Sequence, residues 1–129
     1  MAKNILLVED DQFLSALLKN RLVKEGLEVT AAKDSNEAMT ALRQPSGAQP
    51  DLILMDIILP GKSGFETIEL IKSEPAASQV PVMIISNLGQ ESDVARGKQL
   101  GVVDYFVKAQ TSIDDLVRKI KEFLAPAPN

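Results

Sequence analysis

The chain has 129 residues, of which 45% are hydrophobic and 25% are charged, so it has room for one domain with a sizeable core, which argues against intrinsic disorder. Its 14 basic and 18 acidic side chains give a net charge of −4, which provides no general attraction to nucleic acid or to an anionic membrane. Cysteine and histidine are absent, which excludes disulfides, thiol catalysis, histidine-based catalysis, metal sites built from either residue and a self-made phosphohistidine.

Short apolar runs alternate with longer amphipathic stretches along the chain. The runs cover residues 5–8, 27–31, 52–55, 82–85 and 102–107. Short runs that are apolar on both faces are typical of strands covered by helices above and below. The first run stops at acidic residues and Asp56 interrupts the run that it follows, so neither is a signal peptide or a membrane span. We expect a soluble cytoplasmic protein.

Each run is followed by a helical pattern with apolar residues three or four positions apart. These patterns cover residues 13–22, 35–42, 65–71, 91–100 and 113–124. Asp34 or Ser35 can cap the second helix, and Thr111 or Ser112 can cap the last. Residues 91–100 are the least apolar and include Gly97, so we expect the least stable helix there.

Successive strand–helix units predict an α/β fold with a doubly wound, five-stranded parallel sheet, right-handed crossovers and five helices on its two faces. The strand order expected for such a sheet is 2-1-3-4-5. Residues 1–124 would form this one domain. Residues 125–129 alternate alanine and proline, cannot continue a helix and are either a frayed end or the start of a linker.

The functional prediction rests on the residues after each strand, because open parallel sheets bind ligands beyond the carboxyl ends of their strands. Glu9, Asp10 and Asp11 follow the first strand, Asp56 the third, Ser86 the fourth and Lys108 the fifth. Clustered carboxylates repel one another and favour a hard cation such as Mg²⁺ or Ca²⁺. Asp56 can then attack a phosphoryl group and form an acyl phosphate, with Lys108 and Ser86 stabilising the phosphoryl oxygens.

Plainer explanations compete for some of these residues. Asp11 is better explained as a carboxylate at the start of the first helix, where the helix dipole favours a negative charge. Lys108 and Ser86 taken singly are ordinary surface and capping residues. Asp56 is harder to dismiss, because a carboxylate that ends the most apolar strand is costly unless it has a task.

These motifs resemble the receiver domain of bacterial two-component response regulators, which has the CheY-like variant of the flavodoxin-like fold. The resemblance covers residues 3–124, and its matching segments are residues 5–11, 50–61 and 101–108. It implies a switch that takes a phosphoryl group from a histidine kinase or a histidine phosphotransfer protein, since this chain has no histidine. Such a domain catalyses its own phosphorylation and slow dephosphorylation and is not a turnover enzyme.

The resemblance also implies a role for each matching residue. Asp56 would be the phosphoacceptor, and Lys108 would pair with the phosphoryl group. Mg²⁺ would be held by Asp10, Asp56 and the backbone carbonyl of Ile58, with Glu9 acting through water. Ser86 would close over the phosphoryl group as the hydroxyl switch, and Tyr105 would swing inward with it. Tyr105 also has a plainer explanation, as a half-buried strand residue with a solvent-exposed hydroxyl.

This switching would change the surface formed by the fourth helix, the fifth strand and the fifth helix. The sequence identifies no DNA-binding or enzymatic output segment, so the downstream partner stays open, as do dimerisation and whether the chain stands alone. Neither nucleic acid nor a membrane is expected as a direct partner.

Three residues depart from the family's usual pattern or flank the site. Ala109 replaces the proline that commonly follows the lysine; because a non-proline cis peptide bond costs ~3–4 kcal/mol, we predict a trans bond and an altered loop before the last helix. Asn87 replaces a small residue beside the predicted phosphoryl site. Ile58 places a bulky apolar side chain there, and we hypothesise that it hinders the hydrolytic water.

Other function classes fit less well. Phosphohydrolases of the haloacid dehalogenase class have an Asp-x-Asp pattern, but here Ile58 stands where the second aspartate would be. Residues 61–63 mimic the end of a phosphate-binding P-loop, yet Asp56 replaces the required glycine. A flavodoxin-type redox protein needs an anion-binding loop where this chain has acids. The alternative that stays open is a pseudo-receiver, which binds a partner through the same fold without phosphorylation.

Overall fold

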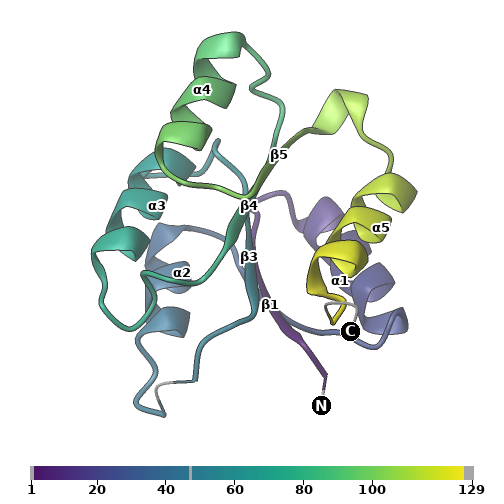
Figure 1. The fold of residues 1–129 in the computed structure, drawn as a ribbon, viewed down its shortest axis with the longest axis horizontal. Helices are drawn as coiled ribbons and strands as arrows, with labels where there is room; N and C mark the ends of the chain where they lie inside the picture. Colours follow the sequence, from purple (N-terminus) through teal and green to yellow (C-terminus); the bar gives the residue numbers. More distant parts are fainter. Residues whose placement is uncertain (1, 47, 127–129) are drawn as a thin grey trace.

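The computed structural model describes residues 2–46 and 48–126, which form a parallel sheet between two layers of helices (Figure 1). The strands are β1 (Asn4–Val8), β2 (Glu28–Ala32), β3 (Leu52–Met55), β4 (Val82–Ser86) and β5 (Asp104–Val107). Their order in the sheet is β2-β1-β3-β4-β5, and every neighbouring pair is parallel. The predicted α/β class and strand order are both confirmed.

The helices also lie where the apolar periodicity predicts them. They are α1 (Gln12–Lys24), α2 (Ser35–Leu42), α3 (Gly64–Ser73), α4 (Glu91–Gln99) and α5 (Ile113–Leu124), and a 3-10 turn covers Lys108–Gln110. Asp34 caps α2 and Ser112 caps α5, which decides between the alternatives left by the sequence. Asp11 is the N-cap of α1, since its Oδ1 accepts a hydrogen bond from the Leu14 amide at 3.1 Å.

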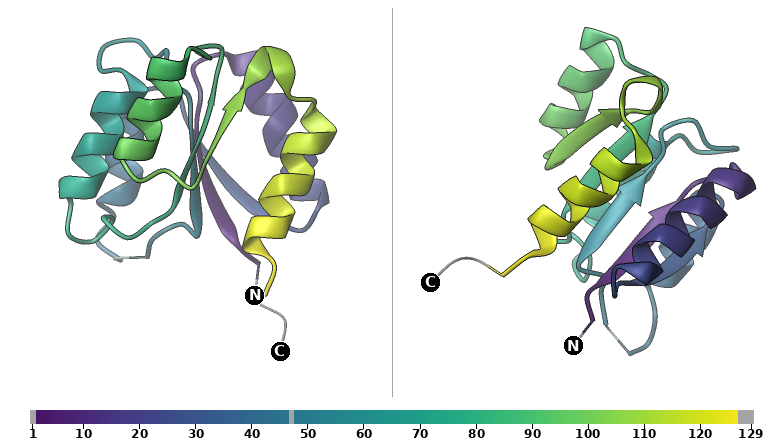
Figure 2. Two further views of the ribbon diagram at one scale, coloured as in Figure 1. Left: turned by 45° about the horizontal axis from the view of Figure 1, so that its top comes forward. Right: turned by 90° about the vertical axis from the view of Figure 1, so that its right-hand side faces the viewer.

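Side-chain alternation along each strand divides the core between the two faces of the sheet. Leu6 and Val8 of β1 pack with residues of α2 and α3, whereas Ile5 and Leu7 pack with residues of α1 and α5. Figure 2 shows the same division, with α1 and α5 on one side and α2, α3 and α4 on the other. Because β1, β3 and β4 are covered on both faces, the residues at their carboxyl ends are held by a rigid, buried support.

Two strands begin later than the apolar runs that predict them. The Leu27 amide donates to the Leu22 carbonyl at 3.2 Å, so Leu27 closes the end of α1 and β2 starts at the next residue. The Val102 amide donates to the Gly97 carbonyl at 3.2 Å, so Val102 likewise closes α4, and β5 starts at Asp104. In both cases apolar residues serve the helix end before the strand begins.

The last helix ends at Leu124, where the predicted domain ends. Of the predicted tail at residues 125–129, residues 127–129 lie outside the part of the chain that the structure describes. Among the described helices, none has both the length and the apolar character that crossing a bilayer would require.

Candidate functional site

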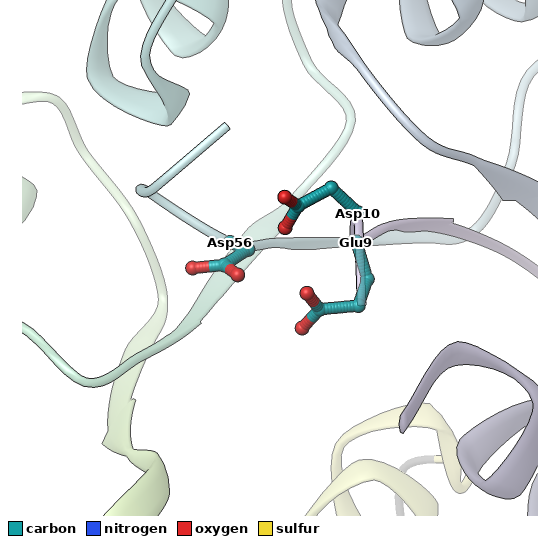
Figure 3. Close-up of side chains that lie close together, drawn as sticks. All are labelled: Glu9, Asp10 and Asp56. Carbon is teal, nitrogen blue, oxygen red and sulfur yellow. The ribbon is translucent and has the colours of Figure 1, made fainter. Parts of the chain in front are cut away.

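Three carboxylates meet at the carboxyl end of the sheet (Figure 3). The Glu9 amide donates to the Ala32 carbonyl and the Asp56 amide donates to the Val8 carbonyl, both at 2.9 Å, so both acids continue the backbone pairing of the sheet. Carboxylate oxygens of Glu9, Asp10 and Asp56 lie within 4.8 Å of one another. Glu9 and Asp56 are buried, whereas Asp10 is exposed and opens the cluster to solvent.

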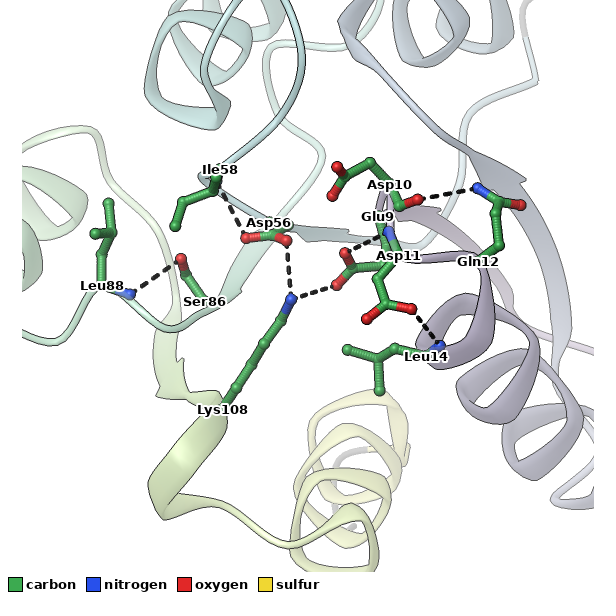
Figure 4. A network of polar contacts seen from close by, with 10 residues as sticks. All are labelled: Glu9, Asp10, Asp11, Gln12, Leu14, Asp56, Ile58, Ser86, Leu88 and Lys108. Atoms are coloured by element: carbon green, nitrogen blue, oxygen red, sulfur yellow. Dashed lines mark hydrogen bonds and ion pairs between the residues drawn. The ribbon is translucent and has the colours of Figure 1, made fainter.

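The ammonium group of Lys108 reaches this cluster from the end of β5 (Figure 4). Its Nζ atom lies 2.9 Å from Asp56 Oδ2 and 2.7 Å from Glu9 Oε1. Lys108 and Asp56 are separated by 52 positions in the sequence, so only the fold brings them together. The structure therefore assembles in one place the acids and the lysine that the strand ends predicted.

Burial dominates the electrostatics of this cluster. It raises the pKa of the Glu9 carboxyl group to about 7; the ion pair with Lys108 opposes this rise, and neighbouring Asp56 adds to it. Burial by itself lowers the pKa of Lys108, but its bonds to Glu9 and Asp56 outweigh that effect, so the pKa is raised. Lys108 thus stays charged at neutral pH and offsets one of the negative charges.

The donor set fits a hard divalent cation. The Oε1 atom of Glu9 is buried and accepts no well-aligned hydrogen bond, although the Lys108 ammonium is 2.7 Å away. Carboxylate oxygens are the ligands that Mg²⁺ and Ca²⁺ prefer, and one ammonium does not balance the acids gathered here. Glu9, Asp10 and Asp56 are therefore a group that can hold such an ion.

The loop after β3 fixes the position of Asp56. The amide of Ile58 donates to Asp56 Oδ1 at 3.2 Å, and the amide of Gly64 donates to the Ile57 carbonyl at 2.8 Å. A Cβ atom on Gly64 would lie 2.2 Å from the carbonyl oxygen of Asp56, so the start of α3 packs directly on this backbone. Gly64 was not among the predicted residues; its signal in the sequence is a glycine at the first position of α3, where glycine has no propensity advantage.

The two predicted switch residues bond to the same loop residue. Ser86 is buried at the end of β4, and its Oγ accepts a hydrogen bond from the Leu88 amide at 3.3 Å. The hydroxyl of Tyr105 donates to the Leu88 carbonyl, so this half-buried tyrosine has a protein partner for its hydroxyl. Burial raises the pKa of the Tyr105 phenol. Leu88, which joins the two side chains, was not among the predicted residues.

The departures from the usual pattern have different outcomes. Every peptide bond within the described residues is trans, including Lys108–Ala109, as predicted. Ala109 lies in the 3-10 turn that leads toward α5, and Asn87 is exposed next to Ser86. Ile58 contacts Asp56 through its amide; the use of its carbonyl as a metal ligand stays a prediction, as do the effects of Asn87 and of the altered loop.

Comparison with known proteins decides the family. Residues 5–121 match the family model of the response regulator receiver domain. The chain belongs to the response regulator receiver domain family. The resemblance in the sequence motifs and the CheY-like strand order are thereby both accounted for.

Curated relatives of this receiver domain include two phosphate regulon transcriptional regulatory proteins named PhoB. The one from Klebsiella pneumoniae is 37% identical over 121 residues, which are 94% of this chain and 51% of the relative. The one from Rhizobium meliloti (strain 1021) is 35% identical over 127 residues, which are 98% of this chain and 54% of the relative. The receiver domain thus spans about half the length of these relatives.

Solved structures agree with this assignment. The phosphorylated cyanobacterial phytochrome response regulator RcpA is 33% identical to this receiver domain, with a TM-score of 0.85 and coverage of 100% of both chains. The Mn²⁺-bound response regulator Rcp1 is 30% identical, with a TM-score of 0.82 and coverage of 98% of this chain and 99% of its own. Both similarities extend over essentially the whole fold.

Proposed function

We propose that this receiver domain is a phosphorylation-controlled switch whose phosphoacceptor is Asp56. An oxygen of the Asp56 carboxylate attacks the phosphorus of a phosphohistidine, a P–O bond forms and the P–N bond breaks, and the histidine leaves. The donor is a histidine kinase or a histidine phosphotransfer protein, because this chain contains no histidine. The domain catalyses this transfer and its own slow dephosphorylation without being a turnover enzyme.

The observation that carries the proposal is the contact between Lys108 and Asp56. A lysine ammonium 2.9 Å from Asp56 Oδ2 is placed to pair with a phosphoryl group attached to that side chain. Glu9 and Asp10 complete the set, and we propose Mg²⁺ as the ion that they and Asp56 hold. When bound, Mg²⁺ would neutralise charge on the phosphoryl oxygens.

The switch itself would operate through Ser86 and Tyr105. A phosphoryl group on Asp56 offers the Ser86 hydroxyl a charged acceptor for its proton and so draws toward Asp56 the side chain whose oxygen accepts from the Leu88 amide at 3.3 Å. The carbonyl of Leu88 also accepts a hydrogen bond from the Tyr105 hydroxyl. A movement of Ser86 would therefore be transmitted through Leu88 to Tyr105 and to the surface formed by α4, β5 and α5.

The relatives support this proposal. RcpA was solved in a phosphorylated form and Rcp1 with a divalent ion, Mn²⁺, and both resemble this chain over nearly its full length. The cytoplasm, where histidine kinases transfer phosphoryl groups, is the location that we propose for the domain.

The test is incubation with Mg²⁺ and a small-molecule phosphodonor, followed by intact mass measurement. We expect the wild-type chain to gain the mass of one phosphoryl group and Asp56→Asn to gain none. Asp34→Asn is the matched control: it makes the same change at the cap of α2, where asparagine caps equally well, and it should be phosphorylated like the wild type. No gain in the wild type, with either the small donor or a phosphorylated histidine kinase, would favour the pseudo-receiver instead.

A further inference from the structure

Helix α4 contacts the sheet through a residue that has no side chain. Among the residues of α4, all of which lie in the described part of the chain, Gly97 is the one that is buried. A Cβ atom built on Gly97 would lie 3.1 Å from Cδ1 of Ile84, 3.2 Å from Cδ2 of Tyr105 and 3.3 Å from Cγ2 of Val102. Carbon atoms in favourable contact are about 3.5–4.0 Å apart, so a methyl group at this position would be crowded on three sides.

The ring of Tyr105 is therefore held at both of its ends. Its Cδ2 edge lies beneath the backbone of α4 at Gly97, and its hydroxyl donates to the carbonyl of Leu88 in the loop that precedes α4. The ring also packs against the hydrophobic core on the α2–α3 side of the sheet. Both ends of this contact depend on how closely α4 approaches β5.

Helix stability does not explain a glycine here. Alanine is the better residue in a helix interior, and at an open position Gly97→Ala would stabilise α4. The crowding around the missing Cβ predicts that the same substitution would disturb the packing of the neighbouring Tyr105 ring. The two effects can thus be separated by experiment.

We infer that Gly97 is a positioning residue for Tyr105: the lack of a side chain at position 97 allows α4 to lie against the tyrosine ring while the ring's hydroxyl reaches Leu88. A side chain at position 97 requires α4 or the side chains around it, the tyrosine ring among them, to shift. The consequence of this inference for signalling is that Gly97 would also affect how Tyr105 responds to phosphorylation, and this consequence rests on the proposed function.

The chain offers a reporter for this inference, because it contains one tyrosine and no tryptophan. Tyrosine fluorescence, its quenching by acrylamide and the absorbance change on phenol ionisation therefore all report on Tyr105 alone. For Gly97→Ala we expect acrylamide quenching to rise toward that of the urea-unfolded chain. We also expect the phenol pKa to fall from its raised value toward the ordinary 10.0. Quenching and pKa equal to those of the wild type, with helix content preserved, would overturn the inference.

Two further variants separate crowding from a general effect on the helix. Lys98→Ala introduces alanine at the exposed neighbour of Gly97. It should leave acrylamide quenching and the phenol pKa at wild-type values. Ile84→Val removes the atom nearest to the missing Cβ, so adding it to Gly97→Ala should restore part of the wild-type quenching. A loss of the tyrosine environment in Lys98→Ala, or no recovery in the double variant, would show that crowding at Gly97 is not the cause.

A last measurement distinguishes failure of this inference from failure of the proposed function. Gly97→Ala leaves Asp56 and Lys108 intact, so it should gain one phosphoryl group by mass, as the wild type does. We expect tyrosine quenching to change on phosphorylation in the wild type and this change to be lost in Gly97→Ala. If neither protein gains mass, the proposed function fails, while the quenching of the two unphosphorylated proteins still decides the role of Gly97.

Discussion

Glu9 carries its negative charge where charge is least favourable, inside the protein and next to Asp56. Its pKa is raised from 4.5 to about 7 by burial first, with Lys108 opposing and Asp56 adding to the rise. Between these pH values the folded protein keeps a proton that the unfolded chain has released. The free energy of unfolding of the metal-free domain should therefore fall as pH rises through this range, by roughly 3 kcal/mol.

Urea unfolding in the presence of a chelator measures this effect. Glu9→Gln preserves the size of the side chain and removes its titration, so its stability should decline less over the same pH range. Glu28→Gln, at an exposed position on the edge strand β2, makes the same change outside the site and should follow the wild type. Parallel pH profiles for the wild type and Glu9→Gln would show that Glu9 does not titrate in this way.

Ile58 is the residue at which the lifetime of the phosphorylated state can be tested. Its side chain is 54% exposed although it lies beside Asp56, and its amide bonds to Asp56 Oδ1. Ile58→Asn keeps that backbone bond and replaces an apolar group by one that can bind water. We expect dephosphorylation to become severalfold faster, measured as loss of the phosphoryl mass after the donor is removed.

A change of polarity far from the site serves as the control for Ile58. Val103→Asn alters an exposed apolar residue whose amide donates to the carbonyl of Val82, at the opposite end of β4 from Ser86. Its dephosphorylation rate should equal that of the wild type. An unchanged rate in Ile58→Asn would remove the idea that this side chain shields the acyl phosphate.

At the scale of elements, α4 contacts its neighbour α3 through an exposed side chain, that of Arg96. The guanidinium of Arg96 lies 4.6 Å from the centre of the Phe65 ring in α3, and its Nη2 lies 3.4 Å from Glu69 Oε1. A cation–π contact at an exposed site contributes about 0.5–1 kcal/mol, and an exposed ion pair adds little. Arg96→Ala should therefore speed amide hydrogen exchange in α4 by about two- to fivefold, with little change in α3.

Hydrogen exchange read by mass spectrometry tests this prediction helix by helix. Arg118→Ala is a matched control, because Arg118 is equally exposed and pairs with Asp115 and Glu122 of its own helix, α5. That variant should leave exchange in α4 unchanged. Equal exchange in α4 of the wild type and of Arg96→Ala would mean that the contacts with α3 do not hold the helix.

The same elements show what local sequence pattern can and cannot predict. Periodicity located every strand and helix, because each has an apolar face that must be buried. It placed the start of β5 too early, because the apolar residue Val102 belongs to the end of α4, where its amide donates to the carbonyl of Gly97. Gly64 was not singled out, and Gly97 was noted only as a weak point of its helix, since the close approach of backbone and ring atoms of other elements to these two glycines is not visible in local pattern.

At the scale of the whole molecule, the site exists because strand order brings distant residues together. The ends of β1 and β3 are neighbours in the sheet, so Glu9 and Asp56 were predictable from the fold class. The place of Lys108 after the fifth strand predicted its role at the same edge of the sheet, but the reach of its ammonium to both Glu9 and Asp56 depends on side-chain direction, which local pattern does not contain. The Leu88 link had no sequence signal, because backbone groups of a loop make both bonds.

A cation bound at this junction should stabilise the entire domain, because its ligands come from segments that separate on unfolding. For an ion that binds only the folded state, stability increases with the logarithm of ion concentration and reaches about 1.4 kcal/mol at tenfold excess over Kd. We expect the unfolding temperature to rise with Mg²⁺ concentration, by the increase that corresponds to this free energy at tenfold excess over Kd. Asp10→Asn should lose most of the shift, whereas Asp11→Asn, one residue away, should keep it because Asp11 caps α1 and asparagine caps equally well. An unfolding temperature insensitive to Mg²⁺, or an equal shift in Asp10→Asn and the wild type, would mean that the three carboxylates do not act together as a metal site.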